Sequence, residues 1–69
     1  MTPGEDAIKR RKTLQRTQAE LAAQTRIDAA RLSRIERGLV VPTLEQAVAL
    51  EAALGIPPSA WVAATEAAP

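Results

Sequence analysis

The stretch that decides the fold runs from Thr17 to Gly38, T-Q-A-E-L-A-A-Q-T-R-I-D-A-A-R-L-S-R-I-E-R-G. It begins with a capping box: the Thr17 hydroxyl can accept from the Glu20 amide, while the Glu20 carboxylate reaches back to the Thr17 amide. We therefore expect a short helix over about 18–24. A tight turn follows, and Ile27, its one large apolar residue, should enter the core.

A second helix is expected over about 29–37, because Asp28 can cap its first amides and Gly38 can end it in a left-handed conformation. Residues advance by about 100° each around a helix, which sorts them onto faces. The face predicted to point inward consists of Leu32, Ile35 and Glu36. The opposite face carries small or basic side chains, those of Ala29, Ala30, Ser33, Arg34 and Arg37, and Arg31 lies on the other flank.

A helix is also expected before this stretch, over about 5–14, with acids in its first turn and a lysine in its last. Residues 1–4 should lie outside it, because proline and glycine are disfavoured inside helices. Its inward stripe consists of Ala7, Ile8, Arg11 and Leu14. An arginine in such a stripe either extends to solvent, where an ion pair contributes little, or meets a buried carboxylate. We favour a buried pair of Arg11 with Glu36.

Two more helices are expected after the stretch, over about 44–54 and from about Pro58. A second capping box, Thr43 to Gln46, opens the first of them. The side chains expected to face inward are Leu44, Ala47, Val48, Leu50, Leu54, Trp61 and Val62. Glu51 falls on the same face, where Arg16 would be its ion-pair partner. The alanine-rich end, from residue 63 on, should fray.

The loop after Gly38, Leu39-Val40-Val41-Pro42, is apolar, although loops normally lie in water. It either folds back onto its own core or forms an exposed patch, and such a patch more often marks an interface. We favour a homodimer contact through Leu39, Val40 and Val41. Trp61 should lie mainly in the core and could contribute to the same contact.

Composition limits the chemistry that is available. Sixty-nine residues allow one domain, 1–69, which we expect to be ordered over about 5–64. The chain has neither Cys nor His, and Ser33 and Ser59 have no base beside them, so we predict no catalytic residue, no metal and no cofactor. Strand signals, a membrane span and a signal peptide are absent from the sequence, and we expect an all-α, five-helix cytoplasmic protein.

Charge is distributed unevenly along the chain. The net charge is only +1, but all nine Lys and Arg lie at or before Arg37. Residues 1–38 carry a balance of +4 and residues 39–69 a balance of −3. A polyanion would be drawn to one end of a compact fold, although ordinary solvated helix faces can show the same pattern.

The run from Arg11 to Ile56 resembles the phage Cro/repressor-type (Xre) helix-turn-helix family. Three features carry the resemblance, which covers about residues 7–62: the Q-A-E-L-A block at 18–22, the L-S-R-I-E-R-G block at 32–38, and Pro42 before the fourth helix. It implies a compact, lambda-repressor-like DNA-binding domain. The helices at about 18–24 and 29–37 would form the helix-turn-helix.

The resemblance also implies roles for single positions. The base-contacting residues would be Ala29, Ala30 and Arg34. Those near phosphates or flanking bases would be Thr17, Gln18, Arg31, Ser33 and Arg37. Arginine suits guanine O6 and N7, and an alanine methyl suits the thymine methyl group. Arg11 and Glu36 match a buried ion pair that joins the first and third helices in many members.

The chain departs from the family pattern at several positions. The family often has glycine at Gln15 and leucine at Arg16, and its turn usually has glycine at Arg26, where another residue in a left-handed conformation is strained. Glu51 replaces a small residue. The loop after Gly38 is usually basic or polar.

These observations favour a homodimeric transcriptional regulator, a repressor or autoregulator associated with the nucleoid. It would bind double-stranded DNA at a pseudo-palindromic operator, with the helix at about 29–37 in the major groove. The alternative is a protein-binding module, such as an antitoxin that binds a toxin and regulates its own gene. A toxin-binding segment is normally a longer extension, and the chain ends about seven residues after Val62. We therefore prefer the first hypothesis.

Overall fold

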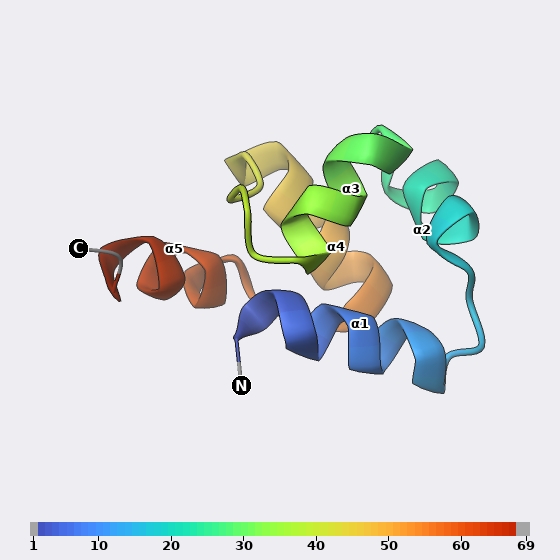
Figure 1. Ribbon diagram of the computed structural model, residues 1–69, viewed down its shortest axis with the longest axis horizontal. Helices are drawn as coiled ribbons and strands as arrows, with labels where there is room; N and C mark the ends of the chain where they lie inside the picture. Colours follow the sequence, from blue (N-terminus) through green and yellow to red (C-terminus); the bar gives the residue numbers. More distant parts are fainter. Residues whose placement is uncertain (1, 68–69) are drawn as a thin grey trace.

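A computed structural model of the chain describes the backbone of residues 2–67 and the side chains of residues 2–62. Within this range the chain forms five helices and no strand: α1 (Pro3–Thr13), α2 (Gln18–Thr25), α3 (Ala29–Glu36), α4 (Leu44–Leu54) and α5 (Pro58–Ala67) (Figure 1). The predicted all-α fold is confirmed. Helix α5 continues to Ala67, beyond the expected start of fraying, and residues 68–69 lie outside the described part.

The helices surround one core. Helix α3 packs against α1 and α2, and α4 packs against α2 and α5. Helix α1 also contacts α4 and α5, which closes the bundle (Figure 1). The loop from α3 to α4 passes along the side of α3 that faces α5 (Figure 1). Helices α2 and α3 thus share one end of the molecule, while the apolar loop lies toward α5.

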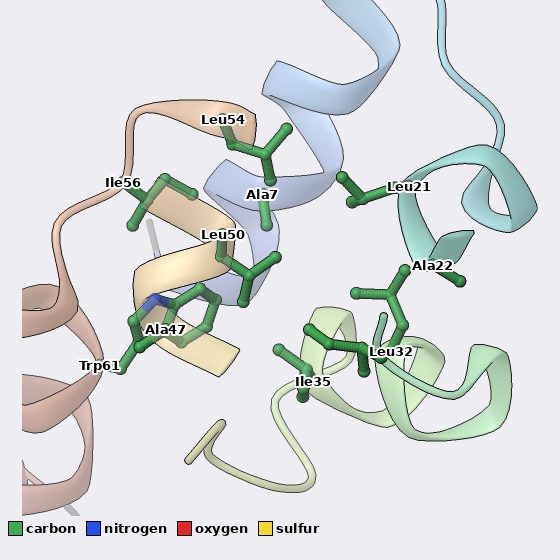
Figure 2. Close-up of a cluster of buried hydrophobic side chains, with 11 residues drawn as sticks. Ala7, Leu21, Ala22, Leu32, Ile35, Ala47, Leu50, Leu54, Ile56 and Trp61 are labelled. Atoms are coloured by element: carbon green, nitrogen blue, oxygen red, sulfur yellow. The ribbon is translucent and has the colours of Figure 1, made fainter. Parts of the chain in front are cut away.

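All five helices contribute to the hydrophobic core, which is drawn in Figure 2. Its largest fully buried side chains are Leu21, Leu32, Ile35, Leu50 and Ile56. Ile27, in the turn between α2 and α3, is only 3% exposed, as its position predicted. Trp61 is also buried and joins α5 to this cluster.

The sequence prediction for the amino-terminal residues was wrong. Thr2 caps α1, because its hydroxyl accepts from the Glu5 amide at 3.1 Å and its own amide donates to Glu5 Oε1 at 3.1 Å. Pro3 occupies the first helical position, where its missing N–H costs no hydrogen bond. Gly4 is buried in α1, and a Cβ there would lie 2.6 Å from the Glu36 carbonyl oxygen. Glycine is needed because α1 approaches the end of α3 closely.

Four apolar side chains expected in the core are exposed: Leu14, Leu44, Val48 and Val62. Leu14 leaves the α1 stripe because the helix has already ended at Thr13. On α4 the prediction merged two stripes, since the buried residues are Ala47, Leu50 and Leu54. Leu44, Val48 and Glu51 follow each other at helical spacing on a neighbouring, exposed face. On α5, Val62 is exposed while the adjacent Trp61 is buried.

The expected ion pair between Arg16 and Glu51 is absent. Both residues are exposed, and within the described range the ion pairs join Arg10 to Asp6 and Arg11 to Glu36. Glu51 requires no partner because it is not part of the core face of α4.

Three helices begin with a capping box: Thr2 with Glu5, Thr17 with Glu20, and Thr43 with Gln46. In the first two, the hydrogen bond from the threonine backbone amide lowers the pKa of the glutamate below its ordinary value of 4.5. The third box uses a glutamine and does not titrate. Acid should therefore weaken the start of α1 and α2 but not that of α4.

The double variant Glu5→Gln/Glu20→Gln tests this difference. A carboxyl whose pKa is lower in the folded state stabilises the fold above its unfolded pKa of 4.5, and this contribution is lost as the pH falls through the folded pKa. Glutamine keeps the capping acceptor without titrating. We expect the free energy of urea unfolding to fall less between about pH 7 and pH 3 in the variant than in the parent chain. Equal losses would contradict this, and Glu45→Gln/Glu51→Gln, two exposed glutamates outside the capping boxes, controls for the change in net charge.

Candidate nucleic-acid interface

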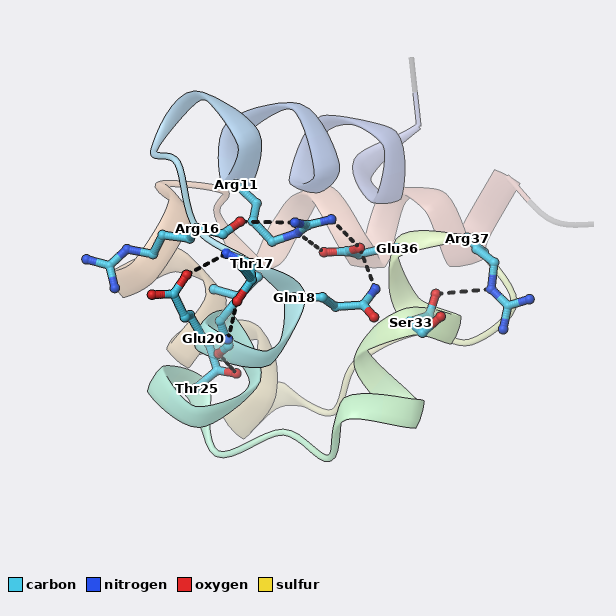
Figure 3. A network of polar contacts seen from close by, with 10 residues as sticks. Arg11, Arg16, Thr17, Gln18, Glu20, Thr25, Ser33, Glu36 and Arg37 are labelled. Atoms are coloured by element: carbon cyan, nitrogen blue, oxygen red, sulfur yellow. Dashed lines mark hydrogen bonds and ion pairs between the residues drawn. The ribbon is translucent and has the colours of Figure 1, made fainter.

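The ion pair between Arg11 of α1 and Glu36 of α3 lies inside the protein. Arg11 Nε donates to Glu36 Oε2 at 2.8 Å, and Arg11 Nη2 donates to Glu36 Oε1 at 3.2 Å (Figure 3). The Glu36 side chain is 2% exposed and that of Arg11 is 13% exposed. The geometry is the bidentate one that makes guanidinium–carboxylate pairs strong. The pair that the sequence predicted is present and buried.

Two further hydrogen bonds extend this pair to the start of α2. Gln18 Nε2 donates to Glu36 Oε1 at 2.9 Å, and Arg11 Nη1 donates to the Arg16 carbonyl oxygen at 3.0 Å (Figure 3). Glu36 therefore accepts from two helices, and every nitrogen of the Arg11 guanidinium group donates. This network holds α1, the α1–α2 connection, α2 and α3 in one arrangement.

The turn between α2 and α3 contains a residue other than glycine in a left-handed conformation. Arg26 ends α2 at φ 59° and ψ 29°, and its amide donates to the Ala22 carbonyl oxygen. The Ile27 amide donates to the same oxygen at 3.2 Å. Gln15, between α1 and α2, has φ 58°. At both positions the family often has glycine, and a left-handed conformation costs other residues about 1–2 kcal/mol. The left-handed conformation considered for Arg26 is confirmed.

The outer face of α3 is open to solvent. Ala29, Ala30 and Arg34 are exposed, and the side chain of Arg34 makes no hydrogen bond or ion pair with the described residues. Ser33 is half-buried beside them. Arg37 is exposed, and its Nε donates only to the Ser33 carbonyl oxygen, at 3.4 Å (Figure 3). Two methyl groups and two guanidinium groups are thus presented on one side of a rigidly held helix.

The other predicted contact residues are already engaged within the protein. Thr17 is exposed, but its hydroxyl accepts from the Glu20 amide at 3.1 Å as the cap of α2. Gln18 is half-buried and supports Glu36. Arg31 is half-buried and donates to Gln46 Oε1 at 3.0 Å and to the Val41 carbonyl oxygen at 3.1 Å. The sequence did not predict these partners of Arg31.

The predicted dimer contact is partly exposed. Leu39 is 64% exposed and Val41 43% exposed, whereas Val40 is half-buried and Trp61 is buried. The exposed large apolar side chains on the loop, α4 and α5 form what we call the apolar face: Leu39, Val41, Leu44, Val48 and Val62. Three of these residues, Val41, Leu44 and Val62, also line a groove together with Pro42, Ala47, Pro58 and Trp61. The sequence did not predict that the members on α4 and α5 are exposed. One signal was present, because the charged Glu51 follows Leu44 and Val48 in the same stripe and indicates that this stripe faces solvent.

Two features are absent from the described part. None of its helices is long and apolar enough to cross a membrane. No group of three or more acidic, His or Cys side chains there is arranged to hold a metal ion.

A comparison with protein-family models identifies the family of the chain. The family model for helix-turn-helix domains matches residues 8–61. The chain belongs to the Cro/C1-type helix-turn-helix family. It is therefore a DNA-binding protein of the kind that regulates transcription, from a family that is not enzymatic. The comparisons with curated proteins and with solved structures gave no match.

The buried network predicts a large effect of removing one partner. Arg11→Ala would leave the Glu36 carboxylate buried without its cation, and we expect a loss of about 3–5 kcal/mol in the free energy of urea unfolding. Asp6→Ala removes the half-exposed pair with Arg10 and should cost less than about 1 kcal/mol. The double variant Arg11→Met/Glu36→Leu should regain most of the loss, because no charge stays buried. Similar effects of Arg11→Ala and Asp6→Ala would contradict the structural role of the network.

Proposed function

We propose that this protein is a homodimeric transcriptional regulator that binds a pseudo-palindromic operator, with α3 of each subunit in the major groove. One observation carries the proposal: the inner face of α3 is held by the buried Arg11–Glu36 pair, while its outer face presents Arg34 without any internal partner. A guanidinium group on a fixed helix suits direct contact with base edges. Two half-sites would lie about one helical turn (~34 Å) apart.

The exposed side chains of α3 suggest how bases are distinguished. Arg34 can donate two hydrogen bonds to guanine O6 and N7, the commonest specific contact in the major groove. Ala29 and Ala30 can contact thymine methyl groups, and their small size allows α3 to approach the bases closely. These three residues are adjacent on one exposed helix face.

Contacts with the DNA backbone would come from the residues around this face. Arg37 is exposed at the end of α3, and the half-buried Ser33 precedes it by one helical turn, between Arg37 and the two alanines assigned to base contacts. Thr17 and Gln18 are at the start of α2, where backbone amides favour an anion. The balance of +4 over residues 1–38 would attract the phosphates to this half of the chain.

The apolar face supports the homodimer. Val41 of the loop, Leu44 of α4 and Val62 of α5 line one groove, and Leu39 and Val48 are further exposed apolar side chains of the same loop and helix. Exposed apolar side chains gathered around a groove on a small domain are typical of an interface. Linking two DNA-binding units raises the effective concentration of the second, which a domain with few phosphate contacts needs.

Base contact by Arg34 can be tested with DNA selected from a random pool. Arg34→Ala should weaken the selected site by about 5- to 150-fold, corresponding to about 1–3 kcal/mol, and should relax the preference at one base pair. Arg37→Ala should instead weaken all sequences alike and reduce the salt slope of binding by about 1. Fluorescence anisotropy titrations at several salt concentrations measure both quantities. Equal loss on all sequences for Arg34→Ala would contradict the base contact.

The homodimer can be tested with a matched pair of exposed leucines. Leu39→Asp places a charge on the apolar face and should raise the dimer dissociation constant by at least about tenfold. Leu14→Asp changes a leucine of similar exposure, 51% against 64%, outside the face and should leave the constant unchanged. Sedimentation equilibrium measures the constant.

A second candidate function is a module that binds another protein, such as an antitoxin that binds a toxin. The same apolar face favours it, since that surface would also fit a different partner. A chain that remains monomeric alone and copurifies with a second protein in a fixed ratio would support this alternative over the homodimer.

A further inference from the structure

Arg31 is the arginine of α3 whose side chain donates hydrogen bonds to segments outside its own helix. Its Nε donates to Gln46 Oε1 of α4 at 3.0 Å, and its Nη2 donates to the Val41 carbonyl oxygen in the α3–α4 loop at 3.1 Å. In contrast, the side chain of Arg34 makes no hydrogen bond or ion pair with the described residues, and the side chain of Arg37 donates only to its own helix. Two directed hydrogen bonds from one half-buried guanidinium group indicate a fixed side chain.

The acceptor on α4 is itself part of a helix cap. Gln46 Oε1 also accepts from the Thr43 amide at 3.0 Å, and the Gln46 amide donates to Thr43 Oγ1 at 3.2 Å. Arg31 therefore contacts the loop at Val41 and the capping box that ends the loop. A single side chain of α3 thus bonds to both the middle of the α3–α4 loop and its end.

The loop has few other hydrogen bonds. The amides of Gly38 and Leu39 donate back to α3, to the carbonyl oxygens of Ile35 and Arg34. Beyond them, the hydrogen bonds of residues 40–43 to the rest of the described chain go to Arg31 or to α4. The buried Pro42 adds an apolar contact. Without Arg31, no hydrogen bond would connect the middle of the loop to α3.

We propose that Arg31 is a positioning residue that holds the α3–α4 loop against the flank of α3, in place of the phosphate contact suggested by the family resemblance. Because Val41 belongs to the apolar face, the same bonds set where that face lies relative to α3. This consequence rests on the proposed function: in a homodimer joined through the apolar face, Arg31 would fix the placement of the two α3 helices on DNA.

The first test measures the loop directly and needs neither DNA nor a dimer. Backbone order parameters from NMR relaxation report the mobility of Val40, Val41 and Thr43. In Arg31→Ala they should fall from about 0.85 to below about 0.6, the range of flexible segments. Arg31→Lys should behave like Arg31→Ala, because one ammonium group lacks the fork geometry that serves both acceptors. Gln46→Glu keeps both acceptor roles and should leave the loop ordered.

The second test measures assembly and DNA binding. Arg31→Ala should raise the dimer dissociation constant about tenfold and leave the salt slope of DNA binding unchanged, whereas a lost phosphate contact would lower the slope by about 1. Leu54→Val truncates the core at the opposite end of α4. It controls for general destabilisation and should move neither quantity. For the order parameters of the first test, Arg37→Ala controls for the loss of one arginine near the loop, and it should leave the loop ordered.

The outcomes separate the two proposals. A salt slope lowered by about 1 in Arg31→Ala, or loop order equal to that of the parent chain, would overturn the role assigned to Arg31. A parent chain that stays monomeric, or that selects no DNA sequence, would contradict the proposed function. In that case the order parameters of the loop would still decide whether Arg31 positions it.

Discussion

The structure depends on one buried carboxylate. Glu36 faces inward from α3 among apolar side chains and is 3% exposed, so its charge must be compensated inside the protein. Arg11 of α1 and Gln18 of α2 supply the donors, and the remaining donor of Arg11 reaches the carbonyl oxygen of Arg16. Because each donor comes from a different segment, the carboxylate can be satisfied only when α1, α2 and α3 have their observed arrangement. Buried ionic groups contribute little net stability, but here the pairing specifies geometry.

This fixed arrangement matters because the two helices of the helix-turn-helix have little stability of their own. Helices α2 and α3 have only eight residues each, and isolated helices shorter than about 12 residues are marginal in water. Both connections that lead to these helices contain a left-handed residue with a full side chain, Gln15 and Arg26. Local propensity therefore opposes these connections to some extent. The core packing of Leu21, Leu32 and Ile35, together with the Glu36 network, offsets this cost.

The parts of the structure that sequence predicted follow from local rules. The capping residues Thr17 and Asp28 and the inner face of α3 need only the spacing along one helix, and they were correct. Gly4 was misplaced because its role depends on the carbonyl oxygens of Ile35 and Glu36 at the end of α3, more than 30 residues away in the sequence. Leu44 and Val48 were misplaced because apolar residues on two adjacent stripes of α4 cannot be ranked without knowing where α5 lies. The acceptors of Arg31 could not be predicted, since a loop carbonyl oxygen has no sequence signal. The DNA contacts are a different case, since they remain predictions.

The faces of α3 have separate tasks, and this separation has a consequence for specificity. Its inner face is fixed by the core and the Glu36 network, and its flank is fixed to the loop by Arg31. The outer face has no such structural role, because the side chain of Arg34 makes no hydrogen bond or ion pair within the described part of the chain and Ala29 and Ala30 are exposed. Substitutions on the outer face would therefore disturb neither the core nor the loop. Under the proposed function, the preferred DNA sequence could therefore change through this surface while the fold and the placement of the helix stay the same.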